Sequence, residues 1–266
     1  MLPFLVLAAT VAAGPVVSAD WVQQHQNDPH VCVIYAGGAE DYQRGHIRGA
    51  RLVDHMDLIR RGNRLASPDE LARSFAQAGV TDGARVVLYG RSPTEIGYVY
   101  GALAAIGFAD DVSWLDGGLT AWRAGNRPVE TATPPEGKGT ITVHPPSDLI
   151  VDAAWMRNHL NSPTTRILDV RTQGEWQRGH VPGATLILWQ DLFSDSEGQV
   201  LKSPEEIRAV LSRAGVRPNQ EVVTYCTMGM RAGLMFFAAH AAGLKPRFYQ
   251  AGWVDWSRDP ANPVAH

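Results

Sequence analysis

The feature that most constrains this fold is an internal repeat that runs along nearly all of the 266 residues. A shift of 134 residues aligns the early segments of the two copies, and a shift of 136 aligns the later ones. The second copy therefore has a slightly longer loop, between Ala184 and Ser203. The matching segments are VVSADW (16–21) with IVDAAW (150–155), EDYQRGHIRGA (40–50) with GEWQRGHVPGA (174–184), SPDELARSFAQAGV (67–80) with SPEEIRAVLSRAGV (203–216), and VVLYG (86–90) with VVTYC (222–226). Such a chain is expected to contain two domains of the same fold.

Each copy is predicted to alternate strands with helices. Ser67 and Ser203 each precede a proline, and a glutamate follows three residues after each serine, which is typical of a helix N-terminus. Strands that alternate with helices indicate an α/β fold, in which a mainly parallel sheet is covered by helices on both faces. Open sheets of this kind bind ligands at the carboxyl ends of their strands, so the site is expected there.

The domain boundaries follow from composition and from the repeat. The stretch RPVETATPPEGKGT (127–140) contains the proline and glycine typical of a linker. We expect an N-terminal domain over residues 15–126, a linker over 127–145 and a C-terminal catalytic domain over 146–266. Because VVSADW has a partner inside the second copy, it is expected to belong to the first domain and to supply its opening strand.

Composition excludes several classes of protein. Hydrophobic residues make up 45% of the chain and charged residues 19%, which is typical of a globular protein rather than a disordered one. The net charge of −3 favours neither a nucleic-acid-binding protein nor a polybasic membrane-binding protein. The two cysteines, Cys32 and Cys226, form neither a disulfide framework nor a metal-ligand cluster. Cys32 lies in the apolar run VCVIY and is expected to be a buried structural thiol.

The first 13 residues, MLPFLVLAATVAA, are apolar and too short to span a bilayer. Val11 and Ala13 are small residues suited to a cleavage point, so the segment resembles the core of a secretory signal. Against this, no lysine or arginine occurs before Arg44, and the alternatives are an extended apolar segment or a misplaced start codon. We expect an exported or periplasmic protein, with a cytoplasmic one as the alternative.

The chemistry expected of the chain centres on Cys226. Residues 222–225 predict a buried strand, a short loop with Gly229 follows, and the next apolar run predicts a helix from near Met230. A thiol between a strand and a helix lies where backbone N–H groups and the positive end of a helix dipole converge. That environment favours the thiolate, which is the nucleophilic form of cysteine. Arg231 adds a permanent positive charge.

The repeat separates the residues needed for the fold from those needed for chemistry. His46 and His180 occupy the same place in both copies, so a structural role is predicted for them. By contrast, the counterpart of Cys226 is Gly90, and a glutamate, Glu95, stands where the second copy has its arginine. The first copy is therefore predicted to be catalytically silent. We expect it to support the second copy and to close one wall of its site.

These residues resemble a tandem-domain rhodanese, a sulfurtransferase family that includes thiosulfate and mercaptopyruvate sulfurtransferases. The most specific match is CTMGMR (226–231), which is similar to the family's loop Cys-x-x-Gly-x-Arg. Supporting matches are LDVR (168–171), GHVPGA (179–184) and the tail GWVDWSRDPANPV (252–264). The resemblance extends from about Val16 to Val264, and it implies two rhodanese-like domains in tandem.

The resemblance implies that the Cys226 thiolate takes a sulfane sulfur from a donor such as thiosulfate. The sulfur would then pass from a Cys226 persulfide to cyanide or to a thiol acceptor, without a metal or an organic cofactor. Backbone N–H groups of the loop would surround the negative sulfur. The implied site residues are the catalytic Cys226, the substrate-binding Thr227, Met228, Gly229, Met230, Arg231 and Arg171, and the supporting Asp169.

Two pairings within this site are left open by the sequence. Arg231 is expected to pair either with donor oxygens or with a carboxylate that holds the loop. Asp169 and Arg171 are expected to brace the loop from the neighbouring strand end, with Asp169 paired to either Arg171 or Arg231.

Loop length and sequence indicate the donor. Related phosphatases have a Cys-x5-Arg loop, whereas the shorter Cys-x4-Arg spacing here favours a single sulfur atom. Arsenate reductases of the same fold are a less favoured alternative for a chain with two covalent repeats. Mercaptopyruvate sulfurtransferases typically have Cys-Gly-x-Gly-Val-Thr in the loop and extra arginine before GHxPG. This chain has CTMGMR there, and its segment TQGEWQR (172–178) is short and contains Glu175. Thiosulfate is therefore predicted ahead of 3-mercaptopyruvate, and the non-enzymatic alternative is a sulfur-carrier or binding module.

The expected partners are a small-molecule sulfur donor and a thiol or cyanide acceptor. A thioredoxin-like or other sulfur-acceptor protein is a further candidate, and neither nucleic acid nor a membrane is expected. Since the pairing of the two copies is already internal, the chain is expected to be a monomer.

Overall fold

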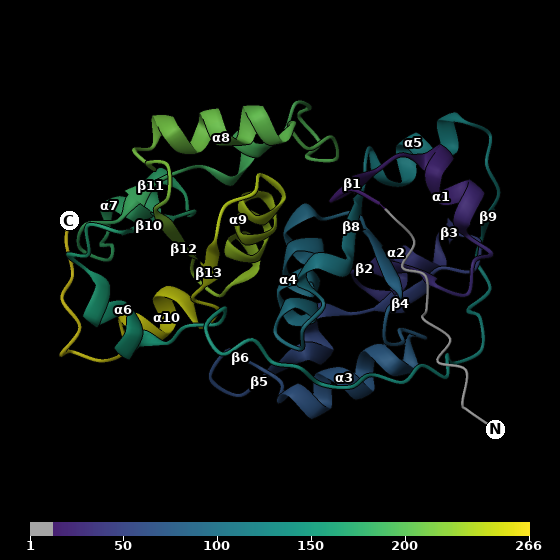
Figure 1. Cartoon of the computed structure of the whole chain (residues 1–266), viewed down its shortest axis with the longest axis horizontal. Helices are drawn as coiled ribbons and strands as arrows, with labels where there is room; N and C mark the ends of the chain where they lie inside the picture. The colour runs from purple at the N-terminus through teal and green to yellow at the C-terminus, as the bar shows by residue number, and fades with distance from the viewer. Residues whose placement is uncertain (1–12) are drawn as a thin grey trace, which may run out of the picture.

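The computed structural model describes residues 13–266 (Figure 1). Nearly all of the expected secretory segment, residues 1–12, lies outside the described residues. The elements of the N-terminal half are β1 (Val16–Val17), α1 (Ala19–His25), β2 (Val31–Ala36), α2 (Ala39–Gln43), β3 (His46–Ile47), β4 (Arg51–Val53), the 3-10 helix η1 (His55–Leu58), β5 (Ile59–Arg60), β6 (Arg64–Leu65), α3 (Pro68–Gln77), β7 (Arg85–Tyr89), α4 (Pro93–Ala104), η2 (Ala109–Asp111), β8 (Val112–Leu115), α5 (Gly118–Ala124) and β9 (Val129–Glu130).

The C-terminal half has a similar alternation of strands and helices. Its elements are α6 (Ala153–His159), β10 (Thr165–Asp169), α7 (Gln173–Gln177), β11 (Thr185–Leu186), η3 (Trp189–Leu192), α8 (Pro204–Arg213), β12 (Glu221–Tyr225), α9 (Met230–Ala241), β13 (Pro246–Phe248) and α10 (Gly252–Trp256).

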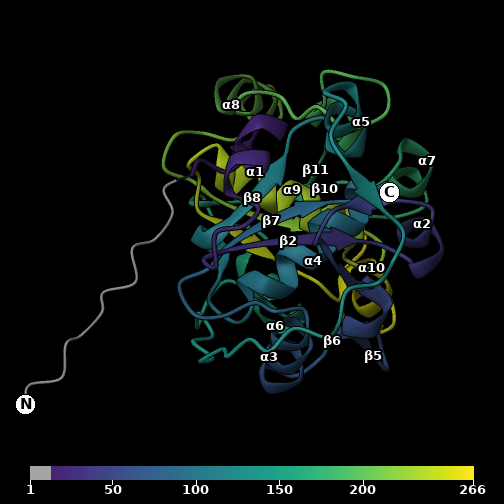
Figure 2. The ribbon, with the colours of Figure 1, turned by 90° about the vertical axis from the view of Figure 1, so that its right-hand side faces the viewer.

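Each half is built on a parallel sheet, which confirms the predicted α/β fold. The N-terminal sheet has the strand order β1-β8-β7-β2-β4, and the C-terminal sheet has the order β11-β10-β12-β13. All pairings within these two sheets are parallel. Figure 2 shows α1 and α5 on one side of β8, β7 and β2, with α3 and α4 on the other. Both faces of the sheet are therefore covered by helices.

The predicted helix starts and the predicted opening strand are present. The side chains of Ser67 and Ser203 each accept a hydrogen bond from the backbone N–H of the glutamate three residues later, and that glutamate accepts one from the serine backbone. β1 pairs with β8, and the equivalent residue of the second half, Ile150, forms a parallel bridge with Phe248. VVSADW is thus part of the first domain.

The two halves meet through helices α4 and α9, which lie side by side at the centre of the molecule (Figure 1). A Cβ atom on Gly97 would lie 2.3 Å from the backbone N of Leu234, so the backbones of the two helices are in direct contact. Tyr100 of α4 packs edge-on against Phe237 of α9, with ring centroids 4.9 Å apart. The hydrophobic core on this side is continuous across both halves.

The segment that connects the halves lies against the first domain. Strand β9, at the start of the expected linker 127–145, pairs antiparallel with β3. Further along, the N–H of Gly137 donates to Gln77 O and that of Gly139 to Ala76 O, both at the end of α3. The connection is held along the domain by these hydrogen bonds rather than acting as a free spacer. Within residues 13–266, none of the helices has the length and apolar character needed to cross a membrane.

Candidate active site

Cys226 directly follows the central strand β12 and precedes α9. Its Sγ accepts a hydrogen bond from the N–H of Gly229 at 3.1 Å, and the residue is 2% exposed. Gly229 has φ 91°, and a Cβ there would lie 2.6 Å from Gln250 O, so glycine is required both by conformation and by space. The sulfur is therefore held at the N-terminus of a 12-residue helix, where the dipole favours negative charge.

The next loop along the sheet fixes the backbone of the cysteine loop. The N–H of Trp253 donates to Cys226 O at 2.8 Å, and that of Val254 donates to Thr227 O at 3.2 Å. A Cβ on Gly252 would lie 2.5 Å from Cys226 O, which only glycine avoids. Met228 is the exposed residue of the loop, with 49% of its surface accessible, and therefore marks the side from which a substrate can approach.

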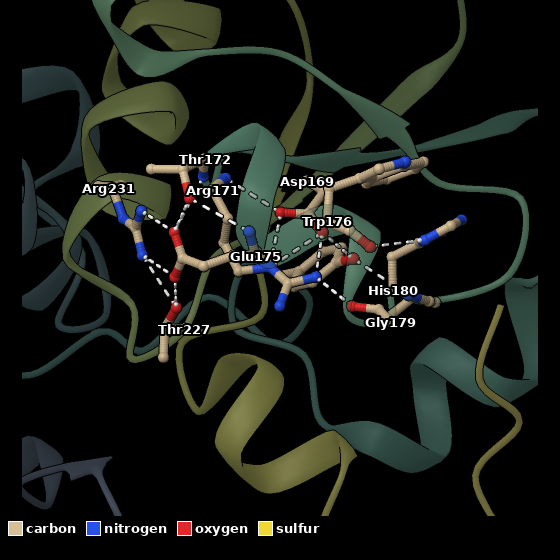
Figure 3. A network of polar contacts seen from close by, with 11 residues as sticks. Asp169, Arg171, Thr172, Glu175, Trp176, Gly179, His180, Thr227 and Arg231 are labelled. Atoms are coloured by element: carbon tan, nitrogen blue, oxygen red, sulfur yellow. Dashed lines mark hydrogen bonds and ion pairs between the residues drawn. The ribbon is translucent and has the colours of Figure 1, made fainter. Parts of the chain in front are cut away.

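Arg231 forms a bidentate ion pair with Glu175 (Figure 3). Its two terminal nitrogens donate to the two carboxylate oxygens at 2.7 and 2.8 Å. Thr227 completes the group: its hydroxyl donates to Glu175 at 2.5 Å and accepts from Arg231 at 2.9 Å. Of the two expected partners of Arg231, the structure therefore provides the carboxylate that holds the loop.

This network sets the charge state of both residues. Hydrogen bonding from Arg231, with smaller contributions from Thr227 and Thr172, lowers the pKa of Glu175 well below its usual value. Glu175 in turn raises the pKa of Arg231, and the nearby Cys226 sulfur raises it further. Glu175 also caps α7, because it accepts from the backbone N–H of Thr172 at 2.9 Å. One carboxylate thus joins the start of α7 to the start of α9.

Asp169 pairs with Arg171, which resolves the other open pairing. Nε of Arg171 donates to both oxygens of Asp169 at 2.9 and 3.0 Å, and a terminal nitrogen donates to Gly179 O at 2.8 Å. The guanidinium stacks on Trp253, 4.5 Å from the ring centroid, and Asp169 also accepts from the hydroxyl of Tyr225. Both charged residues are almost fully buried. The substrate-binding role expected for Arg171 therefore has no support in this geometry, because its guanidinium is enclosed within the domain.

The first domain contributes residues that the sequence did not indicate. Gln250, next to the cysteine loop, donates to the hydroxyl of Tyr98 and to Asn63 O, both at 2.8 Å. The N–H of Leu65 donates back to the Gln250 side chain at 3.1 Å. These contacts join residues more than 150 positions apart, so no local motif could have indicated them. They place the β5–β6 hairpin and α4 beside the loop of Gly229.

The two repeated histidines and Cys32 pack against the fold and lie away from the cysteine loop. His46 stacks on Tyr42 and His180 on Trp176, and each ring Nδ1 contacts the backbone carbonyl of the residue on which it stacks. Cys32 is partly buried rather than fully buried; its thiol donates to Ala78 O at 3.5 Å, and desolvation raises the thiol pKa to about 12. Among residues 13–266, no three His, Cys, Asp or Glu side chains are grouped so that they could hold a metal ion.

The first domain has no room for a cysteine at the equivalent point. A Cβ on Gly90 would lie 2.2 Å from Ala36 O, so a larger residue there would displace the backbone. Glu95, the counterpart of Arg231, lies 4.0 Å from the His55 ring nitrogen, and its pKa is raised mainly by burial. The loop of the first copy has therefore lost both the nucleophile and the geometry around it.

These features define a class of protein: two tandem α/β domains, with a cysteine loop after the central strand of the second one only. The comparison with known families agrees, because the model for the rhodanese-like domain matches residues 18–125 and 152–259. The chain belongs to the rhodanese family and is a sulfurtransferase with two tandem domains.

Individual relatives support this assignment over most of the chain. The protein named "Probable 3-mercaptopyruvate sulfurtransferase" in Pseudomonas aeruginosa is 34% identical over 86% of this chain and 87% of its own length. A thiosulfate sulfurtransferase of Azotobacter vinelandii is 26% identical over 91% of this chain and 94% of its own. The crystal structure of YnjE, named as a thiosulfate sulfurtransferase of Escherichia coli, superposes with a TM-score of 0.84 at 27% identity, over 94% of this chain and 68% of that one.

Proposed function

We propose that this sulfurtransferase carries the transferred sulfur as a persulfide on Cys226. The observation that supports this most directly is the position of Sγ, at the N-terminus of α9 and within hydrogen-bonding distance of the Gly229 N–H. A preorganised donor at this point stabilises negative charge on sulfur before and after transfer. The matching position of the first domain is Gly90, so a single sulfur is carried per chain.

Thiosulfate is the donor that we propose first. The Cys226 thiolate attacks the outer sulfur, the S–S bond of thiosulfate breaks, and sulfite leaves with the bonding electron pair. In the second step cyanide or a thiolate attacks the outer sulfur of the persulfide, and the Cys226 thiolate is released. Neither step needs a proton to be delivered to the leaving group. This fits a site in which the hydrogen bond to Sγ comes from a backbone amide, Gly229.

3-Mercaptopyruvate is the second candidate donor, and the 34% identical relative named for that substrate favours it. In this case the C–S bond breaks, and the carbon of the pyruvate enolate must gain a proton from water or a nearby acid. The α-carboxylate of this donor also needs a cation. Arg231 is already bound by Glu175, so a cation outside this pair would have to meet the donor.

A comparison of the two donors tests the proposal. Steady-state sulfur transfer to cyanide is measured with thiosulfate and with 3-mercaptopyruvate, for the wild type, Cys226→Ser and the matched control Cys32→Ala. We expect kcat/KM to be higher for thiosulfate, and turnover to be lost in Cys226→Ser and retained in Cys32→Ala. Higher kcat/KM for 3-mercaptopyruvate would assign the second donor, and retained turnover in Cys226→Ser would exclude Cys226 as the nucleophile.

The proposed acceptors are cyanide and small thiols, with a thioredoxin-like protein as a further candidate, and the proposed oligomeric state is a monomer.

We also propose that the protein is exported to the periplasm, because residues 1–13 resemble the core of a secretory signal. Sequencing the N-terminus of the protein purified from cells that express it from its own start codon tests the export proposal. A mature chain that begins after residue 13 supports it, and an N-terminus at Met1 contradicts it.

A further inference from the structure

The first domain contains a cavity of about 580 Å³ at the place that corresponds to the active site of the second domain. Gly90, the counterpart of Cys226, lines it together with Arg91, at the carboxyl end of β7. Tyr35 and Leu119, the counterparts of Asp169 and Trp253, also line it. The silent repeat therefore keeps an open space where an α/β sheet ordinarily binds its ligand.

The repeat explains why this space is open. In the second domain the equivalent volume is filled by Arg171, which lies between Asp169 and Gly179 O and stacks on Trp253. In the first domain the counterpart of Arg171 is Gly37, and the Tyr35 ring lies 3.0 Å from where a Cβ of Gly37 would be. The counterpart of Trp253 is Leu119, whose smaller side chain lines the cavity and leaves room that the Trp253 ring fills in the second domain.

A guanidinium from another element lies beside the corresponding glycine of the first domain. Arg123, in α5, places a terminal nitrogen 2.9 Å from where a Cβ of Gly45 would be, and Gly45 is the counterpart of Gly179. In the second domain, the carbonyl of this glycine accepts from the buried arginine. Arg123 forms no ion pair within 4.0 Å among the described residues, because the counterpart of the carboxylate Asp169 is Tyr35. The first domain therefore has an arginine beside this glycine, but it has no carboxylate at the position of Asp169.

The rest of the lining adds hydrogen-bond donors without adding net charge. Asp41 accepts from both Arg44 and Arg91, at 2.9 and 3.0 Å, and Arg44 also pairs with Glu40 at 2.5 Å. Burial raises the pKa of Tyr35 to about 12, so its phenol keeps its proton and can donate.

The longer loop of the second domain, which carries Glu197 and Gln199, forms part of the lining of this cavity. Gln199 donates from its side chain to Arg91 O at 3.1 Å, and its carbonyl accepts from the N–H of Gly117 at 3.1 Å. Among the described residues, Arg123 is the arginine of this lining that has no carboxylate partner, and residues of both domains line the cavity.

We propose that this cavity binds a small organic carboxylate, whose carboxylate group pairs with Arg123. A guanidinium binds a carboxylate through two parallel hydrogen bonds, which gives the pair both strength and a fixed geometry. The cavity volume lies within the range of ordinary small-molecule sites, about 300–1,000 Å³. The site is separate from Cys226 and does not depend on the proposed sulfur donor.

Calorimetric titration with succinate tests the proposal, with the uncharged succinamide and with sulfate as comparison ligands at equal ionic strength. The variants are Arg123→Ala, Leu119→Trp, which restores the large residue of the other repeat, and the control Arg73→Ala on the exposed face of α3. We expect succinate to bind the wild type and Arg73→Ala alike, and to bind Arg123→Ala about tenfold more weakly or worse. Leu119→Trp is expected to abolish binding and to leave sulfur transfer at Cys226 within about twofold of the wild type.

Three results would overturn the proposal. The first is no binding of succinate to the wild type, and the second is equal binding to all four proteins. The third is binding of succinamide or sulfate as tight as that of succinate, since the site would then not select a carboxylate. Because Arg123 is exposed, its variant remains informative if Leu119→Trp fails to fold, which melting curves would reveal.

Discussion

At the scale of single residues, the site depends on how charges are paired. The sequence correctly indicated a carboxylate as one of two partners for Arg231, yet it gave no sign that this carboxylate is Glu175. The spacing of Thr172 and Glu175 matches a helix cap, and the residue does cap α7. Its second role depends on β10 and β12 being neighbours, which brings the starts of α7 and α9 together.

Replacing Glu175 by Gln should loosen the cysteine loop. The change removes the charge that holds Arg231 and keeps the size of the side chain, so kcat is expected to fall roughly tenfold to a hundredfold through misplacement of the loop. The free energy of unfolding is expected to drop by about 2 kcal/mol, since hydrogen bonds to charged groups are lost. The matched control is Asp41→Asn, which changes the counterpart of Glu175 in the silent repeat and removes its ion pair with the exposed Arg91; it should cost less than about 1 kcal/mol with normal turnover.

The stability effect of Glu175 should also depend on pH. The folded pKa of Glu175 is lowered from an ordinary value of 4.5, so its stabilising contribution is complete above that pH. As the pH falls below 4.5 the unfolded chain takes up the proton first, and the contribution decreases until the folded carboxylate is protonated. Urea titrations of the wild type and Glu175→Gln should therefore differ by a constant amount near pH 7 and converge in acid. A difference that grew in acid would contradict the assigned pairing.

At the scale of elements, the local signals predicted the strands, helices and caps well. The strand before Cys226, the helix after it and the two serine caps are all present, because each depends on residues close in sequence. Contacts across the halves were not predictable, since the hydrogen bonds of Gln250 to Tyr98 and Asn63 follow only from the packing of α4 on α9. The burial of Arg171 could not be predicted either, because an arginine expected near a nucleophile is equally typical of a residue that binds substrate.

The contact of α4 with α9 gives a test at this scale. Gly97→Val would place a side chain within 2.4 Å of the backbone of Leu234 and push the helices apart. We expect a loss of about 3 kcal/mol or more in the free energy of unfolding, measured by urea denaturation. Gly38→Ala is the control, because a Cβ there meets nothing within 4 Å, and it should change stability by less than about 0.5 kcal/mol. Equal stability of the two variants would rule out the backbone contact.

At the scale of the whole molecule, the two repeats share a hydrophobic cluster that spans α4 and α9, and they have divided their roles. The second holds the nucleophile, whereas the first supplies the β5–β6 hairpin and α4 beside it. Because the core is continuous across α4 and α9, the domains are expected to unfold together. Far-UV circular dichroism and tryptophan fluorescence should give one coincident urea transition, and two separated transitions would show that the domains are independent.

The most direct test of the central claim is the mass of the protein after treatment with thiosulfate in the absence of an acceptor. The account predicts a gain of about 32 Da, one sulfur atom, confined to the peptide that contains Cys226 and removed by cyanide with formation of thiocyanate. An unchanged mass, or a gain located on the peptide of Cys32, would contradict it.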